Sequence, residues 1–160
     1  MSVHSSEMPP EVVAAFTSAA ITALQELVQI DAVDEPATAP SEVEIVSATM
    51  NLVRPIPGVM SLLFSADSAA FLASRYLPRE SLLSQELIDD VAGEFANVIA
   101  GQAKTMLKGT PYHFALSTPV VVRAGRLADL LITPDAKLVT SLAFESGRLL
   151  VLVNLATSGA

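Results

Sequence analysis

The sequence contains no cysteine, which excludes disulfide bonds, thiolate metal ligands and cysteine nucleophiles. Basic residues are also few: 9 Lys and Arg stand against 17 Asp and Glu, giving a formal net charge of −8. This balance argues against a nucleic-acid partner, because the phosphates would be repelled. No uninterrupted apolar run of about 18 residues occurs, so we expect no membrane span.

Several sequence signals of enzymes are absent as well. There is no G-x-S-x-G of a serine hydrolase, no P-loop and no G-x-G-x-x-G. His4 and His113 stand far apart, and no E-x-x-H or H-x-x-x-H pair occurs. We therefore expect neither a bound metal nor a bound nucleotide.

What is present is an apolar chain long enough to bury a core. It has 160 residues, of which 51% are hydrophobic and 16% charged, so we expect a single folded domain over residues 11–160. Residues 1–10, which end in two prolines, are expected to be a flexible lead. This lead lacks the basic flank and apolar stretch of a signal peptide, so we expect a cytoplasmic protein.

The first half of the chain predicts a long helix followed by a strand pair. Glu11–Ile30 has no Gly or Pro, and its apolar residues recur at steps of three and four, which is typical of an amphipathic helix. Residues 31–41 carry three acids and two prolines and are expected to be a loop. Val43–Val53 and Val59–Phe64, separated by a turn with prolines and a glycine, predict a hairpin.

The second half repeats this order. A short helix, capped by Asp67 and ended by Pro78, leads to a long helix that Ser84 can cap and that ends near Lys108. The strands expected after it are His113–Val122, Lys137–Phe144 and Arg148–Leu155. The fold class is therefore α/β (α+β), with long helices packed on a mostly antiparallel sheet and a pseudo-repeat of structure. Three arginines near the expected turns (Arg123, Arg126 and Arg148) are expected to be solvated.

The helix over 84–108 has two contrasting faces. At about 100° per residue, one face collects apolar residues and should be core: Leu87, Val91, Phe95, Val98 and Ile99. The other carries Glu86, Asp90, Glu94, Asn97, Gly101, Lys104 and Lys108. The acids lie early and the lysines late, which complements the helix dipole and explains them without a metal site.

Three poor helix formers, Gly93, Asn97 and Gly101, flank the acid Glu94. A flat surface of small residues with one carboxylate and one amide is one that a partner could approach closely. The alternative is structural, because glycines also permit close helix packing and surface asparagines are common.

Residues 93–104 read G-E-F-A-N-V-I-A-G-Q-A-K. This string resembles the E-x-x-N helix of the CheC/CheX/FliY chemotaxis phosphatases. Downstream, Ser117-Thr118-Pro119-Val120-Val121 and then Gly125 are similar to the S-x-P-x-V strand of that family. Upstream, Pro57-Gly58 before a strand resembles its hairpin. The likeness covers about residues 12–155, and it implies a CheC/CheX-like fold.

The resemblance implies hydrolysis of the aspartyl phosphate of a CheY-type response regulator. It implies that Glu94 pairs with a lysine of the regulator, that Asn97 orients the attacking water, and that Asp90, Gly101 and Lys104 face the partner. The protein needs no cofactor of its own, because Mg²⁺ belongs to the regulator. The first long helix has no E-x-x-N, so one site is expected, as in CheX, and CheX-type proteins form homodimers by sheet-to-sheet association. The alternative is a non-catalytic receiver-binding module of the same fold.

Overall fold

The computed structural model describes residues 8–35, 44–53, 56–125, 136–145 and 147–155. Within these ranges the chain forms three helices, which are α1 (Pro10–Val28), α2 (Ala66–Tyr76) and α3 (Gln85–Met106). The strands of its sheet are β1 (Val33–Asp34), β2 (Ile45–Val53), β3 (Gly58–Ser65), β4 (Ala115–Leu116), β5 (Val120–Ala124), β6 (Lys137–Phe144) and β7 (Gly147–Leu155).

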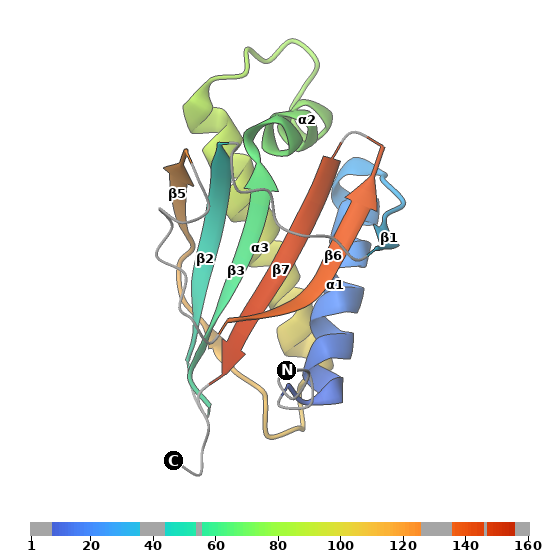
Figure 1. Ribbon diagram of the computed structural model, residues 1–160, viewed down its shortest axis with the longest axis vertical. Coiled ribbons are helices and arrows are strands. Elements are labelled where there is room, and N and C mark those ends of the chain that lie inside the picture. Colours follow the sequence, from blue (N-terminus) through green and yellow to red (C-terminus); the bar gives the residue numbers. More distant parts are fainter. Residues whose placement is uncertain (1–7, 36–43, 54–55, 126–135, 146, 156–160) are drawn as a thin grey trace.

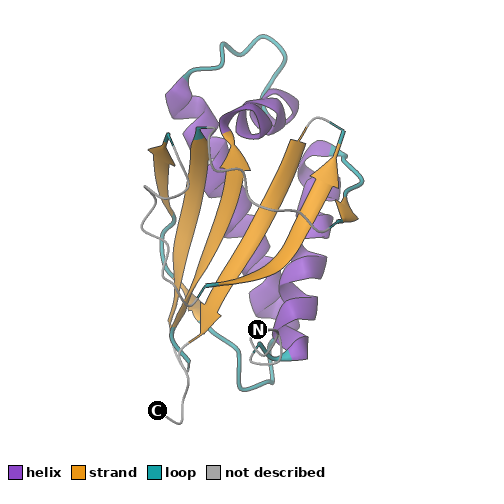
Figure 2. Ribbon diagram, in the orientation of Figure 1, coloured by secondary structure: helices purple, strands orange, loops and turns teal. Residues whose placement is uncertain are grey.

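The molecule has two layers, with α1 and α3 side by side on one face of the sheet and α2 at one end (Figures 1 and 2). The two long helices run in opposite directions (Figure 1). All strand pairs are antiparallel, in the order β1-β6-β7-β3-β2-β4, with β5 also pairing with β2. The expected fold class, long helices on an antiparallel sheet, is confirmed.

The pseudo-repeat has a simple geometric form. Each half contributes a hairpin to the sheet, β2–β3 from the first half and β6–β7 from the second. The pairing of β3 with β7 joins the two hairpins at the centre. Each long helix therefore precedes a hairpin that occupies its own half of one sheet.

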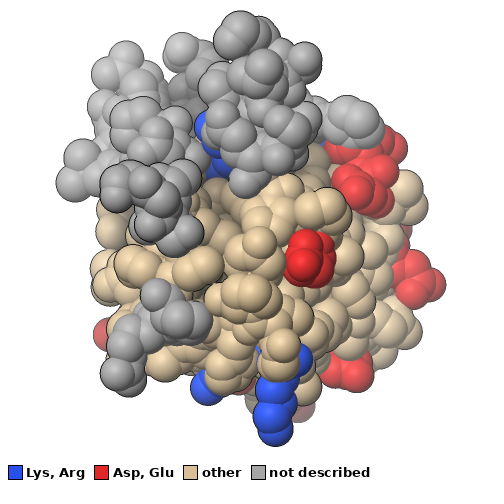
Figure 3. Space-filling view, turned by 90° about the horizontal axis from the view of Figure 1, so that it is seen from below, with Lys and Arg blue, Asp and Glu red and all other residues tan. Residues whose placement is uncertain are grey.

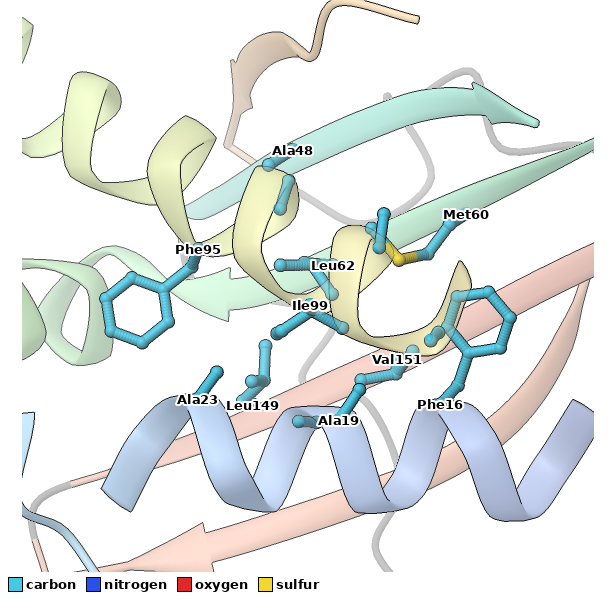
Figure 4. Packing of buried hydrophobic residues seen from close by; sticks show 14 of the residues in the cluster. Phe16, Ala19, Ala23, Ala48, Met60, Leu62, Phe95, Ile99, Leu149 and Val151 are labelled. Carbon is cyan, nitrogen blue, oxygen red and sulfur yellow. The ribbon is translucent and has the colours of Figure 1, made fainter. Parts of the chain in front are cut away.

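The core lies between the sheet and the helices, because strand residues alternate between two faces. On β2, β3 and β7 the alternate residues Ala48, Leu62 and Val151 are buried toward the helices, together with Leu149. Figure 4 shows Ile99 of α3 between these strands and α1, where the small side chains of Ala19 and Ala23 let the two helices come close.

Several predicted boundaries need correction. The cap of α2 is Ser65, whose Oγ accepts a hydrogen bond from the Ser68 N–H at 3.0 Å, and Asp67 lies in the first turn instead. A short strand, β1, lies inside the expected loop over 31–41 and pairs with β6. The single strand expected over His113–Val122 is broken at 117–119 into β4 and β5, and His113 precedes both.

Other boundaries agree closely with the prediction. Ser84 caps α3, α2 ends two residues before Pro78, and the hairpins lie where the sequence indicates. The helix α1 already begins at Pro10, and Met8 is buried in the core. The rest of the expected flexible lead, residues 1–7, lies outside the described residues.

The helix α1 is long and apolar enough to cross a membrane by length and composition. A core helix passes the same test, and eight residues of α1, including Phe16 and Leu24, are buried inside the molecule. The burial of one face against α3 and the sheet accounts for its apolar composition.

Candidate active site

The helix α3 is built to be buried on one side and open on the other. Its N-terminus is fixed by Ser84, whose Oγ accepts a hydrogen bond from the Leu87 N–H at 3.1 Å. Small residues line its sheet-facing side, and the large side chains of Phe95 and Ile99 are fully buried against neighbouring elements. This packing fixes the rotation of the helix about its axis, and so it determines which residues reach the surface.

The predicted polar face is the open side. Asn97, Asp90, Glu86 and Lys108 are exposed, and the residues on the same stripe between them are half-buried: Glu94, Gly101 and Lys104. All five residues that the sequence marks as site residues therefore lie on one accessible stripe of α3. We call the set Asp90, Glu94, Asn97, Gly101 and Lys104 the α3 stripe.

The side chains of Glu94 and Asn97 form neither a hydrogen bond nor an ion pair with any other described residue. They are three residues apart on a helix, so their side chains are neighbours on its surface. One supplies a negative charge and the other an amide that can donate and accept hydrogen bonds. Both groups are therefore available to a partner molecule.

The chain break between β4 and β5 lies alongside the same helix. The Asn51 N–H donates to Ser117 Oγ at 2.9 Å, and the Ser117 N–H donates to the Asn51 carbonyl at 3.3 Å. Pro119 then packs next to the buried Gly93 of α3. The two motifs that carry the family resemblance, on α3 and on residues 117–119, are thus in contact in space.

This contact corrects the interpretation of Gly93. The sequence places it among the small residues of an open surface, whereas the structure buries it against β5 and Pro119. Gly93 and Gly101 are eight residues apart, so at about 100° per residue they point in directions that differ by roughly 80°. This difference is enough for Gly93 to be buried while Gly101 stays accessible.

An ion pair that the sequence does not reveal holds α3 against β5. The Nε atom of Arg123 donates to Asp89 Oδ1 at 2.9 Å, and its Nη1 lies 3.7 Å from Glu44 Oε1. The Arg123 side chain is only 15% exposed. Arg148 is similarly bound to Glu35 and Ser141, so the expectation of solvated arginines is wrong for both, and Arg126 lies outside the described residues.

On its other side α3 is tied to α1. Gln102 Nε2 donates to Glu26 Oε1 at 3.2 Å, and Gln102 Oε1 is buried without a hydrogen-bond partner. A sequence signal for Arg123 exists in the alternation of β5, which puts it on the same side as Val121. No sequence signal indicates the Gln102–Glu26 contact, because that contact depends on how the two helices pack.

The charges of the α3 stripe are ordered along its length, with Asp90 and Glu94 in the first half and Lys104 in the second, while Lys108 lies just beyond the end of the helix at Met106. Seen from the end at which α3 finishes, acidic side chains lie mainly along the right side of the molecule, with one nearer the centre, and basic ones lie at the lower edge and near the top (Figure 3). Much of the visible surface between them is uncharged. No group of three or more His, Cys, Asp or Glu among the described residues could hold a metal ion.

Solved structures with the same fold define the class of protein. CheX from Vibrio vulnificus superposes with a TM-score of 0.76 at 20% identity, covering 91% of this chain and 96% of that one. A chain of the CheX–CheY–BeF3–Mg²⁺ complex from Borrelia burgdorferi gives 0.71 at 16% identity, covering 91% and 97%. FliY from Thermotoga maritima gives 0.63 at 17% identity, covering 93% and 92%. The fold is therefore that of CheX and FliY proteins.

A family model narrows the assignment. The model described as "Chemotaxis phosphatase CheX" matches residues 46–133, which is more than half of the chain, and the protein belongs to that family. The matched region contains α3 and residues 117–119, the two segments whose motifs carry the resemblance. No cofactor is expected for a phosphatase of this family. A comparison with curated proteins finds no match.

Proposed function

We propose that this protein hydrolyses the aspartyl phosphate of a CheY-type response regulator, with the α3 stripe as the docking surface. The observation that carries the proposal is the pair of exposed Asn97 and half-buried Glu94, free of partners among the described residues, in a member of the CheX family. The related Borrelia burgdorferi structure is a complex of CheX with CheY, BeF3 and Mg²⁺, which supports a CheY partner.

The chemistry needs little from this chain beyond positioning. In the proposed reaction a water attacks the phosphorus, and the bond between phosphorus and the aspartyl oxygen breaks. The products are inorganic phosphate and a free carboxylate. An acyl phosphate is already activated, so its hydrolysis is limited mainly by orientation of the water and by charge stabilisation. The Mg²⁺ that stabilises the phosphoryl charge would be bound by the regulator.

Each residue of the pair then has a separate role. The amide of Asn97 enters the regulator's site and holds the water in line, without changing its own protonation state. The carboxylate of Glu94 pairs with a lysine of the regulator and fixes the docking register. Asp90 and Lys104, toward the two ends of the stripe, contribute opposite charges that favour one orientation of the partner.

The first test is Asn97→Ala in an assay of phosphate loss from phosphorylated CheY. We expect turnover to fall by at least about a hundredfold, because an unpositioned water attacks slowly. Binding of CheY should persist, and the melting temperature should not fall, because Ala is the better helix former. The matched control is Gln25→Ala, which removes an exposed amide from α1 and should leave turnover unchanged.

The same assay separates the two functions that the sequence leaves open. A catalytic protein accelerates phosphate loss, and Asn97→Ala removes the acceleration. A non-catalytic module binds CheY but leaves its phosphate lifetime unchanged in both forms. Equal turnover by the wild type and the Asn97 variant would contradict the proposed role of Asn97.

We also propose that the protein acts in the cytoplasm as a homodimer, as the family resemblance implies. Its regulator would be found in the same compartment.

A further inference from the structure

Two glycines interrupt α3, and their surroundings differ. A Cβ atom at Gly93 would lie 3.6 Å from Val121 Cγ2 and 3.7 Å from Pro119 Cγ, which are ordinary packing distances. A Cβ atom at Gly101 would have no atom within 4 Å apart from the adjacent helix backbone. Glycine destabilises a helix interior relative to alanine. At Gly101, packing within the described chain therefore does not explain why the Cβ is missing.

The position of Gly101 on the helix suggests why a side chain is absent there. It follows Asn97 by four residues, so the two lie on the same face of α3, at roughly 5–6 Å between Cβ positions. Asparagine has a short side chain, and its amide can enter a partner's site only if the helix backbone itself comes close. A methyl group at 101 would stand in the space that this approach requires.

The charges around Gly101 indicate how that approach is oriented. Acids of the stripe precede it (Asp90 and Glu94), and Lys104 follows it, so Gly101 lies in the uncharged gap between opposite charges. A partner held by complementary charges on both sides meets the helix most closely in this gap. The gap holds Asn97 and Gly101.

We infer that Gly101 is the point at which the polypeptide around the phosphorylated aspartate of the regulator packs against the backbone of α3. The inference rests on the proposed function, since it takes a CheY-type receiver as the occupant of the stripe. It assigns Gly101 a specificity role: the absence of a side chain admits the receiver, at the expense of helix stability.

The experiment compares Gly101→Ala with Gly93→Ala, a matched change in the same helix at a buried position outside the α3 stripe. The host's CheY proteins are used in two forms, phosphorylated for turnover and loaded with beryllofluoride and Mg²⁺ for binding by calorimetry. Gly101→Ala should raise the melting temperature by about 2–4 °C. It should lower kcat/KM and the affinity for loaded CheY by about tenfold or more, because an extra methyl in a packed contact is poorly tolerated.

Gly93→Ala should be at least as stable as the wild type and should keep kcat/KM within about twofold. Wild-type affinity and turnover in Gly101→Ala would overturn the inference while leaving the proposed function intact, and so would equal losses in both glycine variants. A wild type that binds loaded CheY without dephosphorylating it, with binding weakened only by Gly101→Ala, would instead refute the phosphatase and support the contact. Absence of both binding and turnover would refute both.

Discussion

At the scale of single residues, Gly58 is the clearest case of a side chain that the fold forbids. It is the first residue of β3 and pairs with Leu52 on one side and Leu155 on the other. A Cβ atom here would lie 2.8 Å from Leu155 Cδ2 and closer still to the Asn154 carbonyl oxygen. We expect Gly58→Ala to lower the free energy of unfolding by about 1–3 kcal/mol, because the strand backbone has to move. Urea denaturation measures this.

Gly125→Ala is the control for that experiment. Gly125 is exposed, and a Cβ atom there would meet nothing within 4 Å. Its free energy of unfolding should change by less than about 0.5 kcal/mol. Equal losses in the two variants would mean that the loss at Gly58 comes from backbone flexibility rather than from the close approach of β7.

The shared position of Glu94 and Asn97 on one helix face was the most predictable feature of the candidate site. The Glu94/Asn97 spacing places two polar groups on one helix face whatever the tertiary structure, so their common side follows from periodicity. The predicted exposure of Gly93 was wrong because the number of α3 residues that are buried depends on how closely β5 approaches the helix. The sequence does not contain that distance. Asp67 was wrong as a cap because Ser65, Asp67 and Ser68 all favour a helix start, and only the backbone decides among them.

At the scale of elements, an ion pair between Arg123 of β5 and Asp89 links α3 to the sheet. The pair is a 2.9 Å charge-assisted hydrogen bond whose side chains are 15% and 31% exposed. We expect a coupling energy of about 1–2 kcal/mol between Arg123→Met and Asp89→Asn in a double-mutant cycle, below the value of a fully buried charged pair because water reaches Asp89. Chemical denaturation of the four proteins measures it.

The ion pair lies on the same row of α3 as Asn97, since Asp89, Gly93 and Asn97 follow one another at four-residue steps.

Glu86→Gln is the control for the double-mutant cycle, because Glu86 is an exposed acid on the first turn of α3. A coupling energy near zero would show that packing of Val121 and Pro119, rather than charge, fixes β5 against the helix.

Elements were predictable where their signals are local. The two hairpins and the cap of α3 follow from β-branched alternation and one serine. The sequence predicts one strand over His113–Val122 and misses the break between β4 and β5, because Thr, Pro and Val at 117–122 all favour extended backbone. Pro119, which has no backbone N–H, is the sequence signal for the break, and in the structure Ser117 returns to Asn51 by two hydrogen bonds before β5 begins.

At the scale of the whole molecule, one face of the sheet is covered by α1 and α3, and the other presents residues of the opposite alternation. Part of that second face is polar, with the buried Ser47 and Ser61 and the half-buried Thr49 linked by hydrogen bonds of 3.2 and 3.1 Å. At its margin Val120 and Val122 of β5 are 60% and 47% exposed. Both valines point to the same face of β5, because they are two residues apart.

These valines are the surface that we propose for the homodimer. β5 pairs with β2, and no further described strand pairs with its other edge. Such an edge with exposed valines favours association with a second copy. We expect the wild type to sediment as a dimer and the double variant Val120→Asp/Val122→Asp to sediment as a folded monomer, because paired carboxylates would be desolvated at the interface.

Leu138→Asp is the control that makes this prediction specific. Leu138 of β6 is 48% exposed, and its position opposite Leu152 places it toward the other margin of the sheet. The Leu138→Asp substitution also adds a negative charge to an exposed apolar position, but it leaves β5 unchanged, so this variant should remain a dimer. A monomer after Leu138→Asp, with the valine variant still dimeric, would move the interface to the β6 side. A monomeric wild type at concentrations well above those of the assay would refute the dimer, and the α3 stripe, on the helix side of the sheet, would still be open to CheY.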